Sequence, residues 1–93
     1  MLYREALGYA VRTARLAQGK TLRDVSASAP MALGYLSEIE RGQKELSSEF
    51  VVCVAGALEM TPSQLVLSAS EVLANWESQE AEQITAELAE LAK

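Results

Sequence analysis

The 93-residue sequence predicts an all-α fold, in which five short helices are followed by an extra C-terminal helix. Apolar residues make up 49% of the chain and recur at spacings of three and four, which is the pattern of helices that pack on a core. Aromatic residues make up only 5%, which disfavours a sheet. Capping residues, glycines and prolines divide the apolar pattern into separate helices.

Three helices are expected in the first half of the chain, and the first covers residues 3–18. The second is about two turns long. It begins at the capping signal Thr21–Asp24 and ends before Pro30, which disfavours a helical conformation in the preceding residue. The third covers residues 32–41 and stops at Gly42, because glycine takes the left-handed conformation without strain. The second and third helices, joined by a tight turn, have the proportions of a helix-turn-helix.

Three further helices are expected in the second half. The fourth starts at Ser47 or Ser48, since either residue fits an N-cap. The segment Thr61–Gln64 predicts the start of a short fifth helix, with threonine as the cap and proline at the first helical position. The segment Ser68–Glu71 repeats the capping pattern, so a separate sixth helix is expected from there almost to Lys93.

The net charge of −5 is unevenly distributed. Residues 1–67 contain seven basic and seven acidic residues, whereas residues 68–93 contain six glutamates and one lysine. The chain is therefore expected to consist of a neutral domain, residues 1–67, and an acidic C-terminal helix, residues 68–93. Because nucleic acid repels an acidic surface, any contact with it is expected from the first part.

The third helix has two unlike faces. Leu36 and Ile39 point toward the core, whereas the other face carries small and hydrogen-bonding residues and suits the DNA major groove. Glu38 is acceptor-only, which fits the exocyclic amine of cytosine. Base contacts are expected from Ala32, Leu33, Gly34, Ser37 and Glu38. Contacts with the DNA backbone are expected from Lys20, Arg23, Tyr35, Arg41 and Lys44.

Each of these assignments has an alternative. Leu33 and Tyr35 have a possible place in the core, and Arg41, Lys44 and Glu38 are, taken singly, ordinary surface charges. Their combination on one tight-turn helix pair is what favours DNA.

Glu40 lies at the buried edge of the third helix, next to Ile39. A buried carboxylate needs a positive partner, and Arg15 near the end of the first helix is the candidate. The sequence therefore predicts an Arg15–Glu40 ion pair that locks the first helix to the third and has a structural role.

The C-terminal helix carries an apolar stripe that the small five-helix core leaves without a partner. Such a stripe is typical of a dimerisation helix, here with Trp76 as the anchor, and the alternative is a helix folded back on its own domain. The stripe consists of Val72, Leu73, Trp76, Ile84, Leu88 and Leu91. A homodimer would place two recognition helices about 34–36 Å apart on a two-fold DNA operator. If the protein activates transcription, its acidic helix is a candidate surface for RNA polymerase.

Several other classes of protein are not expected. The sequence has no histidine and a single cysteine, Cys53, which rules against an internal disulfide and a zinc-ligand set. No apolar run approaches the roughly 20 residues of a membrane span, and the N-terminus lacks the apolar segment of a signal peptide. Without a phosphate-binding glycine loop or histidine, an enzyme is not expected. The sequence thus predicts a cytoplasmic protein without cofactor, metal, membrane contact or small-molecule ligand; the competing prediction is a protein-binding module of the antitoxin or adaptor type.

Three segments resemble the Cro/phage-repressor (Xre-type) helix-turn-helix family: Arg15–Ser26, Gly34–Gly42 and Ala57–Leu65. The resemblance covers residues 4–67 and implies a lambda-repressor-like domain with the third helix in the major groove. It adds Leu22 to the expected backbone contacts, and it matches the predicted ion pair to one that the family carries.

More narrowly, the segment Leu33–Glu45 resembles the actinobacterial Clp gene regulators, which activate genes for the ATP-dependent Clp protease. The resemblance implies a sequence-specific transcriptional activator that binds a two-fold operator. Two residues depart from the wider family: Ala32 replaces the usual serine or threonine cap, which weakens the helix start by about 1 kcal/mol, and Pro30 replaces the turn glycine. The base-reading positions contain no glutamine or arginine, so the operator sequence does not follow from better-known relatives.

Overall fold

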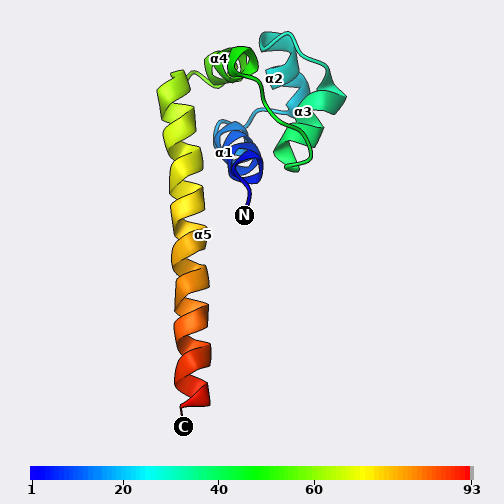
Figure 1. Ribbon diagram of the computed structural model, residues 1–93. Coiled ribbons are helices and arrows are strands. Elements are labelled where there is room, and N and C mark those ends of the chain that lie inside the picture. The colour runs from blue at the N-terminus through cyan, green and yellow to red at the C-terminus, as the bar shows by residue number, and fades with distance from the viewer. Residues whose placement is uncertain (93) are drawn as a thin grey trace.

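The computed structural model describes residues 1–92, which form five α-helices and no strand (Figure 1). The helices are α1 (Tyr3–Ala17), α2 (Leu22–Ser28), α3 (Leu33–Glu40), α4 (Ser48–Ala57) and α5 (Pro62–Leu91). The prediction of an all-α fold is confirmed, and the first four helices begin and end close to their expected positions.

The long helix α5 replaces the separate fifth and sixth helices that the sequence predicted. Its start is as expected, because the Thr61 hydroxyl accepts a hydrogen bond from the Gln64 N–H at 3.2 Å and the Gln64 side chain accepts one from the Thr61 N–H at 2.9 Å. The prediction that a separate helix starts at Ser68–Glu71 is wrong. A capping sequence begins a helix only where the preceding chain leaves the helical conformation, and no glycine or proline interrupts residues 63–91.

The helix-turn-helix of α2 and α3 forms as predicted. The Thr21 hydroxyl accepts from the Asp24 N–H at 3.0 Å, and the Asp24 carboxylate accepts from the Thr21 N–H at 2.9 Å. These hydrogen bonds lower the pKa of the Asp24 carboxyl below its ordinary value, and the bond from the Thr21 backbone N–H has the largest effect. Gly42, at φ +73°, ends α3 in the left-handed conformation, and its N–H donates to the Ile39 carbonyl at 3.0 Å. As the sequence implied, Ala32 gives α3 no side-chain cap.

Helix α1 lies between α3 and α5 and packs on both (Figure 1). The largest fully buried side chains are Val11, Val25, Leu36, Ile39, Val54, Leu58 and Leu65. Where α1 crosses α3, Gly8 is buried, and a Cβ on it would overlap the Ile39 carbonyl oxygen and lie 3.1 Å from the carbonyl carbon. The absence of a side chain at Gly8 therefore sets how closely α3 sits on the domain.

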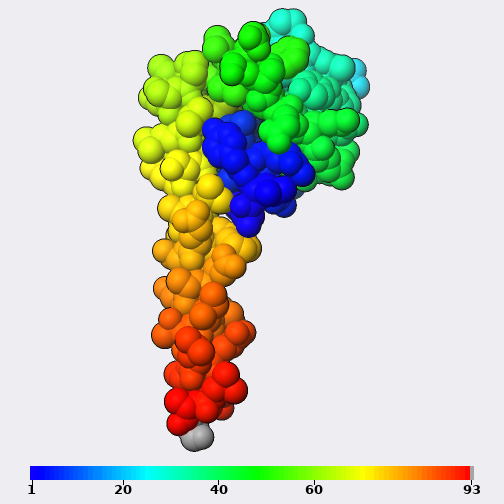
Figure 2. Space-filling view, viewed as in Figure 1, coloured from blue at the N-terminus to red at the C-terminus, as the bar shows by residue number. Residues whose placement is uncertain are grey.

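The molecule is elongated because α5 continues past the domain on which its first half packs (Figures 1 and 2). Its principal extents are 57 × 25 × 23 Å. The second half of α5 extends beyond α1 and α3 (Figure 1), and its large apolar residues Ile84, Leu88 and Leu91 are exposed.

Two general features complete the description of residues 1–92. No single helix within residues 1–92 is long and apolar enough to cross a membrane. Taken together, α4 and α5 meet the criterion of length and composition, but the two helices are bent by 98° relative to each other. Across the same residues, no group of three or more His, Cys, Asp or Glu side chains is placed to hold a metal ion.

Candidate nucleic-acid interface

The outward face of α3 consists of the residues that the sequence predicted to read bases. Ala32, Leu33 and Gly34 are exposed, and Ser37 and Glu38 are half-buried. Leu33, for which a place in the core was the alternative, is 42% exposed. Beneath this face, Leu36 and Ile39 are buried and fix the helix to the domain. The residues of this outward face therefore contribute little to the packing of the domain.

Gly34 is an exposed helical glycine that nothing inside the fold explains. A Cβ at this position would meet no atom within 4 Å. Since glycine in a helix is about 1 kcal/mol less favourable than alanine, the domain carries a locally unfavourable residue here. Its one structural effect is to leave the α3 backbone open to the approach of another surface.

The predicted ion pair between Arg15 and Glu40 is present. Arg15 Nε donates to Glu40 Oε2 at 2.7 Å and Nη2 donates to Oε1 at 2.9 Å, so the pair is bidentate. The side chains are only 11% and 5% exposed. The hydrogen bond to Glu40 raises the pKa of Arg15 above its ordinary value, against the opposing effect of burial. Arg15 Nη1 also donates to the Lys20 carbonyl at 2.9 Å, which ties α1 to the turn before α2.

Arg41 follows α3 directly, and its guanidinium turns back along the outward face. Nη1 donates to the Ser37 hydroxyl oxygen at 2.8 Å, and Nη2 lies 3.5 Å from Gln43 Oε1. The side chain is exposed, and among residues 1–92 it takes part in no ion pair. Arg41 is thus held beside a residue of the base-reading face.

Lys20 and Tyr35, from which the sequence predicted DNA contacts, have hydrogen-bond partners within the domain. The Lys20 ammonium donates to the Ala57 carbonyl at 2.9 Å and so binds the last turn of α4, where a positive charge is favourable. The Tyr35 hydroxyl donates to the Glu45 carbonyl at 2.8 Å, and its ring packs edge to face on Phe50 at a centroid distance of 5.6 Å. The single O–H donor of Tyr35 is thus engaged within the domain, and the predicted DNA contacts of Lys20 and Tyr35 stay predictions.

Three of the expected backbone contacts remain available at the edges of the helix pair. Arg23 and Lys44 are exposed, and within residues 1–92 neither forms an ion pair. Leu22 is half-buried, but its N–H lies in the first turn of α2, where backbone donors have no acceptor within the helix. Such donors suit a phosphate oxygen.

The apolar stripe of the C-terminal helix divides into two parts. Val72 and Leu73 pack partly against the core, so these two residues serve their own domain as well as any partner. Trp76, Ile84, Leu88 and Leu91 are 38%, 52%, 62% and 81% exposed. Packing on its own domain thus holds for Val72 and Leu73, and dimerisation through the exposed residues stays a prediction.

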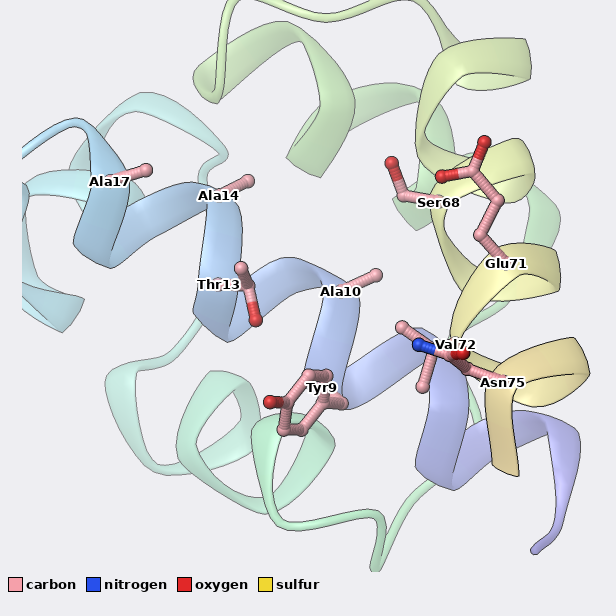
Figure 3. Close-up of a pocket in the computed structure, with 9 residues that line it drawn as sticks. All are labelled: Tyr9, Ala10, Thr13, Ala14, Ala17, Ser68, Glu71, Val72 and Asn75. Atoms are coloured by element: carbon pink, nitrogen blue, oxygen red, sulfur yellow. The ribbon is translucent and has the colours of Figure 1, made fainter. Parts of the chain in front are cut away.

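A groove of about 360 Å³ separates α1 from the first half of α5 (Figure 3). Tyr9, Thr13 and alanine methyl groups of α1 form one wall, and Ser68, Glu71, Val72 and Asn75 of α5 form the other. None of these residues belongs to α3, so the groove is separate from the base-reading face.

Two residues that the structure singles out were not predicted from the sequence. The contact of Gln43 with Arg41 depends on the turn that Gly42 makes after α3. Gly8 carries no local signal, because its role appears only where two helices distant in sequence cross.

Known proteins similar to the chain are transcriptional regulators. The transcriptional regulator ClgR of Mycobacterium tuberculosis (strain H37Rv) is 50% identical over 76 residues, which cover 82% of this chain and 68% of that protein. The crystal structure of the clp gene regulator ClgR from Corynebacterium glutamicum matches with a TM-score of 0.89 and 38% identity, over 96% of this chain and 95% of that one. The restriction-modification controller protein C.AhdI from Aeromonas hydrophila matches with a TM-score of 0.65 and 26% identity, over 67% and 94%. No model of a protein family matches the sequence.

Proposed function

Because the chain belongs to the ClgR branch of the Xre-type helix-turn-helix transcriptional regulators, we propose that it binds operators of clp genes through α3. The observation that carries the proposal is the outward face of α3, which is exposed, lacks bulk at Gly34 and has its anchoring residues beneath it. Regulation of clp genes is supported by the name of the ClgR relative from Corynebacterium glutamicum, a clp gene regulator.

The base-reading surface comprises Ala32, Leu33, Gly34, Ser37 and Glu38. Small and apolar groups at the start of α3 suit thymine methyls, and the Glu38 carboxylate suits the cytosine amine. Arg23, Lys44 and the Leu22 N–H lie at the edges of this surface and contact phosphates, which fix the position of the helix without reading sequence.

The function is tested by selecting bound duplexes from random DNA with the wild-type protein and with Glu38→Ala. The variant is expected to lose about 1–3 kcal/mol of discrimination at one base pair, because the acceptor for cytosine is gone. Glu82→Ala, which removes the same charge from the far half of α5, is the control and should select the wild-type sequence. An equal loss on all duplexes would show that Glu38 acts through the fold or through general electrostatics.

Salt dependence separates DNA binding from the competing protein-binding module. Affinity for the selected duplex is expected to fall log-linearly with added salt as phosphate counterions are released. Affinity that ignores both salt and DNA sequence would favour the antitoxin or adaptor class.

Gly34→Ala separates the cost of glycine to the fold from its use in binding. The substitution is expected to stabilise the domain by about 1 kcal/mol, because alanine is the better helix former and its methyl meets no neighbour. It is also expected to weaken DNA binding, since the methyl occupies space that the DNA needs. Thermal unfolding and duplex titration measure the two effects. A stabilised variant with unchanged affinity would place Gly34 outside the contact surface.

We propose that the far half of α5, together with Trp76 just before it, holds a homodimer, with Trp76, Ile84, Leu88 and Leu91 at the contact. A two-fold dimer presents two copies of α3 to successive major grooves. The acidic surface of the same half-helix, directed away from α3, is the region available to RNA polymerase if the protein activates transcription.

Ile84→Glu is expected to convert the dimer to a monomer in sedimentation experiments, because the dimer would have to bury an unpaired carboxylate. Ala86→Glu, two residues further and on the other side of the helix, adds the same charge and should leave the dimer intact. Dimers that persist in Ile84→Glu and in a chain truncated after residue 79 would place the interface elsewhere.

A further inference from the structure

We propose that Arg41 reads a guanine in the operator and that Ser37, rather than reading a base itself, is a positioning residue for it. The inference rests on the proposed binding of DNA by α3 and assigns to Arg41 a task different from the phosphate contact that its position after the helix suggests. It also supplies the arginine that the base-reading positions themselves do not contain.

The Arg41 side chain points back along α3. A residue that follows the last turn of a recognition helix would ordinarily lie beside the DNA backbone. The hydrogen bond of 2.8 Å from Nη1 to Ser37 instead brings the guanidinium back by one turn, into the middle of the outward face. Gln43, at 3.5 Å from Nη2, supports the group from the other side.

The Arg41 guanidinium keeps N–H donors that are available to a ligand. It has five N–H donors in a rigid planar fork, and the contacts with Ser37 and Gln43 use two of them. Glu38 lies three residues before Arg41, at a spacing that often joins opposite charges, yet no ion pair joins them in the described chain. Arg41 is exposed and Glu38 is half-buried, and neither charge neutralises the other beside the proposed base-reading face.

The donors of the Arg41 guanidinium match the acceptors of guanine. Guanine presents two acceptors in the major groove, O6 and N7, and a fork of donors fits them together, which makes arginine–guanine the commonest specific contact. No other side chain of the face offers two donors: Ala32, Leu33 and Gly34 offer none, and the Glu38 carboxylate only accepts. Arg41 as a donor and Glu38 as an acceptor would together read a guanine and a cytosine.

Lys44 provides the contrast. It lies beyond the turn at Gly42, is exposed, and has no hydrogen bond or ion pair with residues 1–92 that holds it against α3. A compact ammonium on a flexible stem suits a phosphate rather than a base edge. Its replacement should therefore weaken binding to all sequences alike.

The test is selection from random duplex DNA by the full-length protein and its variants Arg41→Ala, Ser37→Ala, Ser37→Thr and Lys44→Ala. Arg41→Ala is expected to lose about 5- to 150-fold of the preference for guanine at one position, the loss of one bidentate contact. Ser37→Ala should lose a smaller part of the preference at that same position, and the double variant should be no worse there than Arg41→Ala alone. Ser37→Thr keeps the hydroxyl oxygen and should keep the preference. Lys44→Ala should lower affinity without changing the selected sequence.

Unfolding midpoints of the variants, expected to match the wild type since these side chains lie at the surface, separate binding effects from folding effects. A uniform loss on every duplex in Arg41→Ala, or changes in Ser37→Ala at a different base pair, would overturn the assignment while leaving sequence-specific binding intact. A wild-type protein that selects no sequence would overturn the proposed function itself.

Discussion

Removing either partner of the buried ion pair is expected to destabilise the domain by about 3–5 kcal/mol. In Glu40→Ala the Arg15 guanidinium remains largely buried without its carboxylate, and in Arg15→Ala the Glu40 carboxylate, 5% exposed, is left without a donor. Much of the loss is the cost of an uncompensated buried charge rather than the net strength of the pair. Urea denaturation of both variants measures it.

An exposed ion pair in the same domain provides the control for this prediction. Arg4 and Glu45 form a second ion pair, at 3.4 Å, whose side chains are 39% and 73% exposed. Because solvent screens such a pair, Glu45→Ala is expected to cost less than about 1 kcal/mol. Arg15→Lys should not restore stability, since a point charge cannot make the bidentate contact with Glu40 and also reach the Lys20 carbonyl. Equal losses in Glu40→Ala and Glu45→Ala would contradict the structural role of the buried pair.

Replacing Gly8 with alanine is expected to destabilise the domain by about 3 kcal/mol. The added methyl would overlap the Ile39 carbonyl oxygen, which belongs to backbone and cannot turn aside as a side chain would. Helices α1 and α3 would have to separate, so the Arg15–Glu40 contact and the placement of α3 would change with them. The loss is expected in thermal unfolding and, to a larger extent than stability alone explains, in DNA affinity.

Gly56→Ala is the matched control. Gly56 lies in helix α4, is exposed, and a Cβ on it would meet no atom within 4 Å. Alanine there should therefore stabilise by about 1 kcal/mol through helix propensity alone. If Gly8→Ala and Gly56→Ala shifted the unfolding midpoint in the same direction, close packing of α1 on α3 would not be what Gly8 provides.

The sequence predicted those parts of the molecule that depend on local signals. The Thr21 and Thr61 caps, the stop at Gly42 and the buried side of α3 follow from residues three or four positions apart. The Arg15–Glu40 pair was predictable despite its long range, because a carboxylate at a buried edge requires a cation and few were available.

Other features depend on which backbone groups the fold brings together. The acceptor of Lys20 is a carbonyl 37 residues away, and that of Tyr35 lies in the loop after α3, so charge and hydroxyl alone did not predict these intramolecular bonds. The start signal at Ser68 failed for a related reason: a capping pattern does not show whether the chain before it has stopped being helical. The sequence predicted Arg41 at the end of α3, where the structure has it, but the direction of its side chain came only from the contact with Ser37.

Helix α5 is a single uninterrupted helix that joins the packed domain to the apolar residues at its far end. Each residue of an α-helix advances about 1.5 Å and turns about 100°, and α5 contains no glycine or proline hinge after Pro62. The distance and rotation between the packed domain and the apolar residues at the far end are therefore fixed by the number of residues between them. In a dimer joined at that end, the separation and phase of the two recognition helices, and hence the operator spacing that they accept, would be set by helix length rather than by a flexible linker.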